Sequence, residues 1–287
     1  MAGFLKRVSD GPVYIKDLLH AKVGGMEEAR QHTTIHASML TSDVEFCPRR
    51  VMIAEREGIK RKARLVDTPL RMTFDQGWHM QYKINNSYLR DVMYGHWKCG
   101  CDTLTYGTLG AELQDCITCG TAAKDYVYQE VLLIDSKNGF TGSVDGFVLM
   151  RGRLHLLEVK IMDKDLFKAL KLPMAEHKAR TQLYLQMVKE DPTVPSGGIP
   201  FNLEDARLLY IMRGFGMKDD KGRISPFKEF IIKASPSNAK IYQDKALSVH
   251  NAREYGTMPD RICPNAMCTR AELCSLSKRC FSGAYKD

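Results

Sequence analysis

Two carboxylates and a lysine are spaced in this sequence as a site for a hard metal ion requires. In the segment TGSVDGFVLMRGRLHLLEVKIM, Asp145 comes seven residues before Gly152, and Glu158 comes six residues after it. If the flanking strands pair as a hairpin around Gly152, the two acids lie nearly opposite each other. Lys160 is two residues after Glu158, so both side chains point to the same face of a strand.

This trio suits phosphate chemistry. Carboxylate oxygens are the ligands that Mg²⁺ and Mn²⁺ prefer, and such a cation acidifies water and stabilises charge on a phosphate. The ammonium group of Lys160 can orient the water or offset the phosphate charge. A single carboxylate near a strand ordinarily just faces solvent, so it is the spacing of all three residues that indicates a site.

The nine cysteines form a second pattern. Four are grouped as C-x-C and C-x2-C, four lie near the end of the sequence, and Cys47 stands alone; the groups are Cys99, Cys101, Cys116, Cys119 and Cys263, Cys268, Cys274, Cys280. In a reducing compartment such groups indicate metal rather than disulfides, with buried structural thiols as the alternative. The first group has the paired knuckle spacing of structural zinc. The zinc-binding segment could grip DNA, dock a protein partner or only stabilise an insertion.

The elements that must position these residues read as a mixed α/β (α+β) fold. One helix is expected from residue 42 and a second over 73–92, and strands are expected at 126–134, 142–150 and 154–161. A helix over 174–189, strands over 206–212 and 227–233, and a helix over 237–253 follow. This order predicts a central mixed sheet flanked by helices. We divide the chain into an N-terminal arm (1–41) and one domain (42–281), with a zinc-binding insertion at 95–121 and a cysteine cluster at 263–280.

The totals suit a cytosolic protein with a polyanionic partner. Lysine and arginine exceed the acids by 42 − 34 = 8, which favours nucleic acid, although a basic protein without such a partner is the alternative. No apolar run approaches the roughly 20 residues of a membrane span. The N-terminus has a basic pair but no apolar core of a signal peptide.

The carboxylate segment resembles a known family. GSVDGFV followed by LEVK is similar to the D…ExK signature of PD-(D/E)xK nucleases, especially the RecB-like branch with its restriction-endonuclease-like fold. The resemblance implies that Asp145 and Glu158 hold Mg²⁺ or Mn²⁺. It also implies that Val159 offers its backbone carbonyl to the metal and that Lys160 assists the nucleophile.

Further positions match this branch in part. Gln182, in TQLYLQM, matches the glutamine of a Q-x-x-x-Y motif, while Gln186 occupies the tyrosine position and Tyr184 lies nearby. Glu130 falls where family members often carry an acid on the preceding strand.

The branch also implies an upstream histidine as a metal ligand. His79 is two residues short of the matching position, which Gln81 occupies. Residues two apart on a helix point about 200° from each other. Either His79 serves after a local shift, or Gln81 takes its place.

Cys47 adds a resemblance to iron–sulfur RecB-like nucleases, which include CRISPR-adaptation nucleases and AddB-type domains. Its setting, SDVEFCPRR, is similar to their start. The resemblance implies a 4Fe–4S cluster held by Cys47 and three of the four C-terminal cysteines, one being spare. A zinc ion held by the C-terminal cysteines alone is the alternative.

The resemblance implies a DNA exonuclease acting on single-stranded ends in recombination, replication or repair, in a phage or bacterial setting. Predicted DNA contacts are Arg49, Arg50, Arg180, His177 and Tyr184. Basic residues between positions 49 and 64 could track phosphates or simply form a solvated helix face. Two rivals stay open: a non-catalytic DNA-binding or scaffold subunit with a decayed nuclease site, and a zinc–iron regulatory protein that senses redox state.

Overall fold

The computed structural model of the chain describes residues 15, 23, 25–26, 34–42, 46–59, 65–108, 113–191, 194–214, 217–218, 222, 224–283 and 285. The chain divides into two compact units, Met1–Gln31 with Lys60–Met80, and His32–Ile59 with Gln81–Asp287. In the first unit, strand β1 (Gly25–Met26) pairs antiparallel with β3 (Leu65–Val66). Helix α4 (Thr68–Lys83) begins in this unit and enters the second at Gln81.

The second unit is built on a seven-stranded mixed sheet. The strand order is β14-β11-β10-β9-β4-β5, with β6 also on β4. β10 and β11 are parallel and the other pairs are antiparallel. The bounds are β4 (Met93–Lys98), β5 (Leu104–Thr108), β6 (Val127–Gln129), β9 (Gly146–Met150), β10 (Arg153–Met162), β11 (Asp205–Met212) and β14 (Phe227–Lys233). The predicted mixed sheet with flanking helices is therefore confirmed.

Two chain segments leave this sheet to form a smaller one. Its strands are β2 (Ile35–His36), β8 (Phe140–Val144) and β7 (Val131–Asp135). β6 gives way to β7 at Glu130, and β8 gives way to β9 at Asp145. The predicted strands 126–134 and 142–150 are thus each broken once, because their two halves pair in different sheets.

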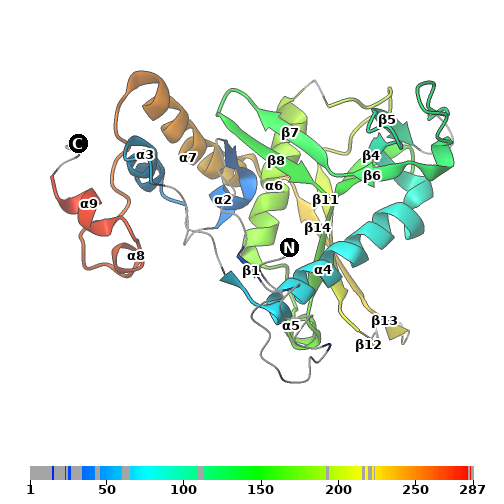
Figure 1. Cartoon of the computed structure of the whole chain (residues 1–287), viewed down its shortest axis with the longest axis horizontal. Helices are drawn as coiled ribbons and strands as arrows, with labels where there is room; N and C mark the ends of the chain where they lie inside the picture. The colour runs from blue at the N-terminus through cyan, green and yellow to red at the C-terminus, as the bar shows by residue number, and fades with distance from the viewer. Residues whose placement is uncertain are drawn as a thin grey trace, which may run out of the picture. The chain divides into compact units, whose positions relative to one another are not determined.

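Long helices cover the sheets. The main ones are α6 (Ala175–Glu190) and α7 (Pro236–Tyr255), which pack against each other, and α6 also contacts β7, β11 and β14 (Figure 1). α2 (Ala37–Thr41) packs on α6, and α3 (Pro48–Arg56) packs on α7. α6 and α7 confirm the predicted helices 174–189 and 237–253. The core between these layers is apolar and includes Leu133, Phe147, Leu156 and Leu183.

Shorter elements complete the second unit. They are the π-helical turn η2 (Ile84–Tyr88), the 3-10 turns η3 (Arg90–Val92) and η4 (Ala123–Asp125), helices α5 (Lys164–Ala169), α8 (Thr269–Glu272) and α9 (Ser277–Phe281), and the hairpin β12 (Met217–Lys218) with β13 (Ile224–Ser225). None of the described helices has both the length and the apolar content that crossing a bilayer requires.

Three predicted boundaries differ from the structure. Residues 35–41 of the predicted arm form β2 and α2 in the second unit, whereas most of the arm lies outside the described residues. The helix predicted over 73–92 begins at Thr68, where Asp67 Oδ1 accepts from the Leu70 N–H at 2.8 Å, and gives way to η2 after Lys83. The segment 95–121 is only partly an insertion, because β4 lies inside the main sheet with Trp97 fully buried.

Candidate active site

The β9–β10 hairpin brings together the predicted trio. Arg151 and Gly152 both have positive φ, as a two-residue type I′ turn requires. The hairpin register ends at Leu157 opposite Gly146, so the next pair in line is Glu158 and Asp145. Lys160 Nζ lies 2.5 Å from Glu158 Oε1 and 3.8 Å from Asp145 Oδ2. The spacing argument from the sequence is therefore confirmed as geometry.

The break between β8 and β9 frees one edge of β10 for the site. Beyond Leu157 β9 no longer pairs with β10, and the Asp145 side chain takes over by accepting from the Val159 N–H at 2.6 Å. The Val159 carbonyl accepts from Lys160 Nζ at 3.0 Å. That carbonyl, a predicted metal ligand, thus lies against the Lys160 ammonium of the trio. The chain can pass this close to Met93 and Tyr128 only because residue 146 is a glycine, since a Cβ there would collide with both side chains.

Two amides hold Asp145 from the helical side. Gln81 Nε2 donates to Asp145 Oδ1 at 2.6 Å and to Glu130 Oε1 at 3.4 Å. Asn85 Nδ2 donates to the Asp145 carbonyl at 3.2 Å. Gln81 therefore occupies the position at which the resemblance implies a histidine. The sequence analysis did not include Asn85, although its i+4 spacing from Gln81 places both on one helix face.

His79 belongs to the first unit. Its ring meets Trp78 edge-on at a centroid distance of 5.0 Å. Its predicted role as a metal ligand stays a prediction.

The trio has two carboxyl groups and only one ammonium group, so it lacks positive charge. Glu158 is 2% exposed, and burial with the nearby Asp145 charge raises its pKa to about 7, against the opposing effect of Lys160. Burial alone would lower the pKa of Lys160, but the Glu158 and Asp145 carboxylates raise it on balance. Within the described part of the chain, the buried Glu158 Oε2 has no hydrogen-bond partner. A buried unpartnered carboxylate oxygen costs roughly 1–3 kcal/mol or more.

These residues fit a divalent cation. The Glu158 and Asp145 carboxylates and the Val159 carbonyl are hard oxygen donors that all lie near Lys160 Nζ, and Glu158 Oε2 has no hydrogen-bond partner among the described residues. A cation there would satisfy that oxygen and favour the ionised form of Glu158.

The predicted residues of α6 have other contacts. Gln182 is buried and bonds through its amide to the Lys233 carbonyl at 2.9 Å and to Asn238 at 3.1 Å. Tyr184, predicted as a DNA contact, is only 2% exposed and packs against Gly142, so it does not present a surface to DNA. Arg180 is ion-paired with Glu176 and is mostly buried.

His177 lies beside the trio rather than in it. Its Nδ1 is 2.9 Å from the Tyr210 hydroxyl. Burial and the nearby charges of Lys160 and Arg180 lower its pKa to about 4, so the ring is neutral at pH 7. A neutral ring adds no positive charge for a phosphate.

Of the two predicted DNA contacts on α3, burial excludes Arg49, and the prediction for Arg50 stays a prediction. Arg49 is fully buried and donates to the backbone carbonyls of Pro259 at 2.8 Å and Tyr285 at 2.5 Å. Arg50 lines a pocket among cysteines. Most of the basic stripe beyond them, at 60–64, lies outside the described residues.

Four cysteines gather at the end of β4. Sulfur–sulfur distances are 3.2 Å for Cys99–Cys101, 3.5 Å for Cys99–Cys116, 3.7 Å for Cys101–Cys116 and 3.8 Å for Cys99–Cys119. Four thiolates about 2.3 Å from a tetrahedral zinc ion would lie about 3.8 Å apart. Backbone N–H groups of Cys119 and Thr118 lower the pKa of Cys116. These four cysteines could bind a metal ion, as the spacing predicted.

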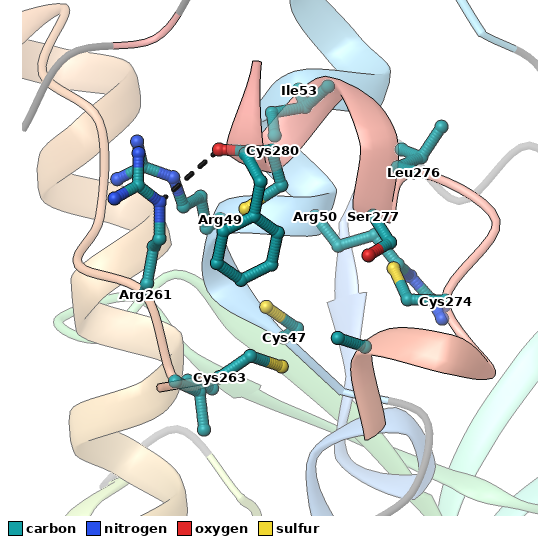
Figure 2. Close-up of a pocket in the computed structure, with 13 residues that line it drawn as sticks. Cys47, Arg49, Arg50, Ile53, Arg261, Cys263, Cys274, Leu276, Ser277 and Cys280 are labelled. Carbon is teal, nitrogen blue, oxygen red and sulfur yellow. Dashed lines mark hydrogen bonds between the residues drawn. The ribbon is translucent and has the colours of Figure 1, made fainter. Parts of the chain in front are cut away.

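The other cysteines meet around a second pocket. Cys47, which immediately precedes α3, lines it together with Cys263, Cys274 and Cys280 from the C-terminal segment (Figure 2). Cys268 shares a hydrogen bond with Cys263. The whole pocket that these and other residues line has an empty volume of ≈ 340 Å³, open solvent included. The structure thus brings Cys47 to the C-terminal cysteines across most of the chain.

Polar contacts attach the C-terminal segment to α3 beside this pocket. Arg270 donates to the Phe46 carbonyl at 2.7 Å, and the Tyr285 hydroxyl donates to Glu57 at 2.6 Å. Arg279 is ion-paired with the same Glu57. With the two bonds of Arg49, these contacts form a clasp between residues 46–57 and 259–285.

Comparisons with known proteins identify no family. No family model matches the sequence, and no curated protein matches it. A solved structure described as "Crystal structure of SSO0001" is similar at 14% sequence identity, over 92% of this chain and 97% of that chain, with a TM-score of 0.37. A TM-score of this size supports no conclusion about fold or function.

Proposed function

We propose that the chain is a metal-dependent DNA nuclease of the PD-(D/E)xK class, of the RecB-like iron–sulfur kind, acting on single-stranded ends. One observation carries the proposal: Glu158 Oε2 is buried without a hydrogen-bond partner among the described residues, beside Asp145 and Lys160. Two acids and a lysine buried together are costly unless a cation or substrate completes the set.

The residues divide the work. Asp145, Glu158 and the Val159 carbonyl would hold Mg²⁺ or Mn²⁺, which supplies a Lewis acid that acidifies water and offsets phosphate charge. Lys160 presents an ammonium group to the phosphate and to the attacking water. Gln81 orients Asp145, because its amide donates to Oδ1. Glu130 accepts from the same Gln81 amide, which holds this carboxylate beside Asp145.

Both cysteine groups have structural roles in this proposal. Cys99, Cys101, Cys116 and Cys119 hold zinc at the end of β4. Cys47 and three C-terminal cysteines hold a 4Fe–4S cluster, and the guanidinium groups of Arg50 and Arg261 that line the pocket offset the negative charge of four thiolates.

The test is degradation of end-labelled single- and double-stranded DNA by anaerobically purified protein with Mg²⁺ or Mn²⁺. We expect Glu158→Gln and Lys160→Ala each to lose activity by about 10²–10³-fold or more, because each removes a charge from the reacting centre. The matched control is Glu204→Gln, the same chemical change at an exposed position, which keeps full activity. End labels at each terminus report the polarity.

The rival is a DNA-binding or scaffold subunit with a decayed site. It is favoured by Gln81, whose amide stands where the resemblance implies a histidine ligand. DNA binding without metal-dependent cleavage, equal in the wild type and Glu158→Gln, would establish the rival and reject the nuclease.

A further inference from the structure

Three side chains form a polar row across the sheet beside the candidate active site. Lys160 on β10 is paired in register with Tyr210 on β11, and Tyr210 is paired with Lys228 on β14. Because paired residues project to the same face of a sheet, the row continues from the site across two strands. Lys160 belongs to the candidate active site, whereas Tyr210 and Lys228 hold a neighbouring segment of the chain.

Tyr210 and Lys228 anchor the chain that follows β10. The Tyr210 hydroxyl accepts from the Met174 N–H at 3.1 Å and bonds to His177. Lys228 Nζ donates to the carbonyls of Leu170, at 2.9 Å, and Phe167 at the end of α5. The connector between α5 and α6 is therefore fixed on the sheet next to Lys160.

The outer side of this connector is apolar and basic. Leu172 is 75% exposed and Met174 is 44% exposed, although both are large apolar side chains on a well-anchored segment. The exposed lysines Lys168, Lys171 and Lys178 lie around them, and none forms an ion pair with any residue that the structure describes. We call these five residues the α5–α6 surface.

The nearby acids do not neutralise this surface. Asp163 accepts the Asp165 and Leu166 N–H groups as the N-cap of α5. Glu176 is paired with Arg180. Asp165 is exposed and forms no ion pair with these lysines among the described residues, so the three ammonium groups are available to an external anion.

We propose that the α5–α6 surface binds the single-stranded DNA that enters the candidate active site. This inference rests on the proposed nuclease function and names the substrate path. Lys168, Lys171 and Lys178 contact successive phosphates, and Leu172 and Met174 contact bases. A duplex would present paired and stacked bases to those apolar side chains, whereas a single strand presents open base faces. The rigid anchoring means that the path exists before DNA binds.

The experiment measures binding of fluorescent oligo-dT to the full chain by anisotropy over a salt series, without added Mg²⁺ or Mn²⁺. The test variant is Lys168→Ala/Lys171→Ala/Lys178→Ala. Its control is Lys137→Ala/Lys189→Ala/Lys240→Ala, which removes the same net charge at exposed positions elsewhere. The slope of log K against log salt falls by about 2 in the test variant, at about 0.7 per lost phosphate contact. It stays at the wild-type value in the control.

A second variant separates base contacts from charge. Leu172→Ser weakens oligo-dT binding severalfold and leaves the salt slope unchanged, because it removes an apolar contact and no cation. Equal binding and slope in the two triple variants would overturn the inference, as would tighter binding of a blunt duplex than of oligo-dT. Loss of binding in the test variant without cleavage by the wild type in any metal would keep the surface and reject the nuclease. If the wild type and the test variant cleave DNA equally well, the nuclease function is supported and the α5–α6 surface is rejected as the DNA path.

Discussion

The two oxygens of the Glu158 carboxylate have different surroundings. Oε1 lies 2.5 Å from Lys160 Nζ, while Oε2 is buried and, among the described residues, unpartnered. Folded proteins rarely bury a carboxylate oxygen without a hydrogen-bond partner, because removing it from water is costly when nothing replaces the lost hydrogen bonds. Asymmetry of this kind is a better mark of a functional group than burial alone.

His177 carries a prediction about pH and stability. Its folded-state pKa is lowered to about 4, below the unfolded value of about 6.5. The unfolded chain therefore binds the proton first, so stability present above about pH 6.5 is lost as pH falls toward 4. Because the ring is partly exposed, we expect the loss to be about 1–2 kcal/mol.

The measurement is urea unfolding of the wild type and His177→Gln at pH values from neutral to about 4.5. Glutamine keeps a hydrogen-bonding group for Tyr210 and does not titrate. The difference in unfolding free energy between the two proteins should shift in favour of the variant as pH falls. A difference that is constant across the series would contradict a histidine that partial burial keeps neutral in the folded protein.

For single residues, the sequence predicted which side chains share a strand face better than it predicted their contacts with distant segments. The period of two in a strand was enough to place Glu158 and Lys160 on one face opposite Asp145. It could not predict that Arg49 is buried or that Tyr184 faces Gly142, because those contacts join segments far apart in the chain. A basic or aromatic side chain near a site has no sequence signal that distinguishes a buried position from a DNA contact.

The strand breaks are the main feature that the pattern of elements missed. Residues 126–134 and 142–150 each read as one strand, because local alternation continues through Glu130 and Asp145. The structure divides both at these acids, since the halves hydrogen-bond in different sheets. Strand pairing is a long-range property, so the order of elements was predictable and the corner that holds the acids was not.

The cysteine segment after β4 gives a prediction at the scale of an element. Cys119→Ser should release the proposed zinc ion, because three thiolates bind it far more weakly than four. We expect amide hydrogen exchange to rise over residues 99–103 and 113–121 and to stay slow in β10 and β11. Zinc content by mass spectrometry and exchange by peptide mapping are the two measurements.

The matched control is Cys47→Ser, which should keep the proposed zinc ion and leave the exchange at 99–103 and 113–121 at its wild-type rate. Because β4 is part of the main sheet, its own residues should remain protected in both variants. Exchange that rises throughout the sheet in Cys119→Ser would contradict a local role for this site.

For the whole molecule, the clasp and the second pocket join the two ends of the second unit. Cys47→Ser should lose the visible absorbance and the iron of the proposed cluster. A link that closes so long a loop contributes on the order of 3–5 kcal/mol to stability, so the thermal midpoint should fall clearly. Iron content, absorbance and thermal unfolding under anaerobic conditions are the measurements.

Replacing each C-terminal cysteine by serine in turn identifies the spare residue, because only the variant at that position keeps its iron. Full iron content in Cys47→Ser would show instead that a metal is held by the C-terminal cysteines without Cys47.

The clasp also fixes the order in which parts of the fold can form during synthesis. Residues 46–57 leave the ribosome long before residues 259–285, and synthesis proceeds at about 5–20 residues per second. Until the later segment emerges, Arg49 and Glu57 lack the partners that they have in the finished fold. The cysteine pocket therefore forms only after residues 263–280 have been synthesised, and a polypeptide that stops before them would lack the proposed iron site.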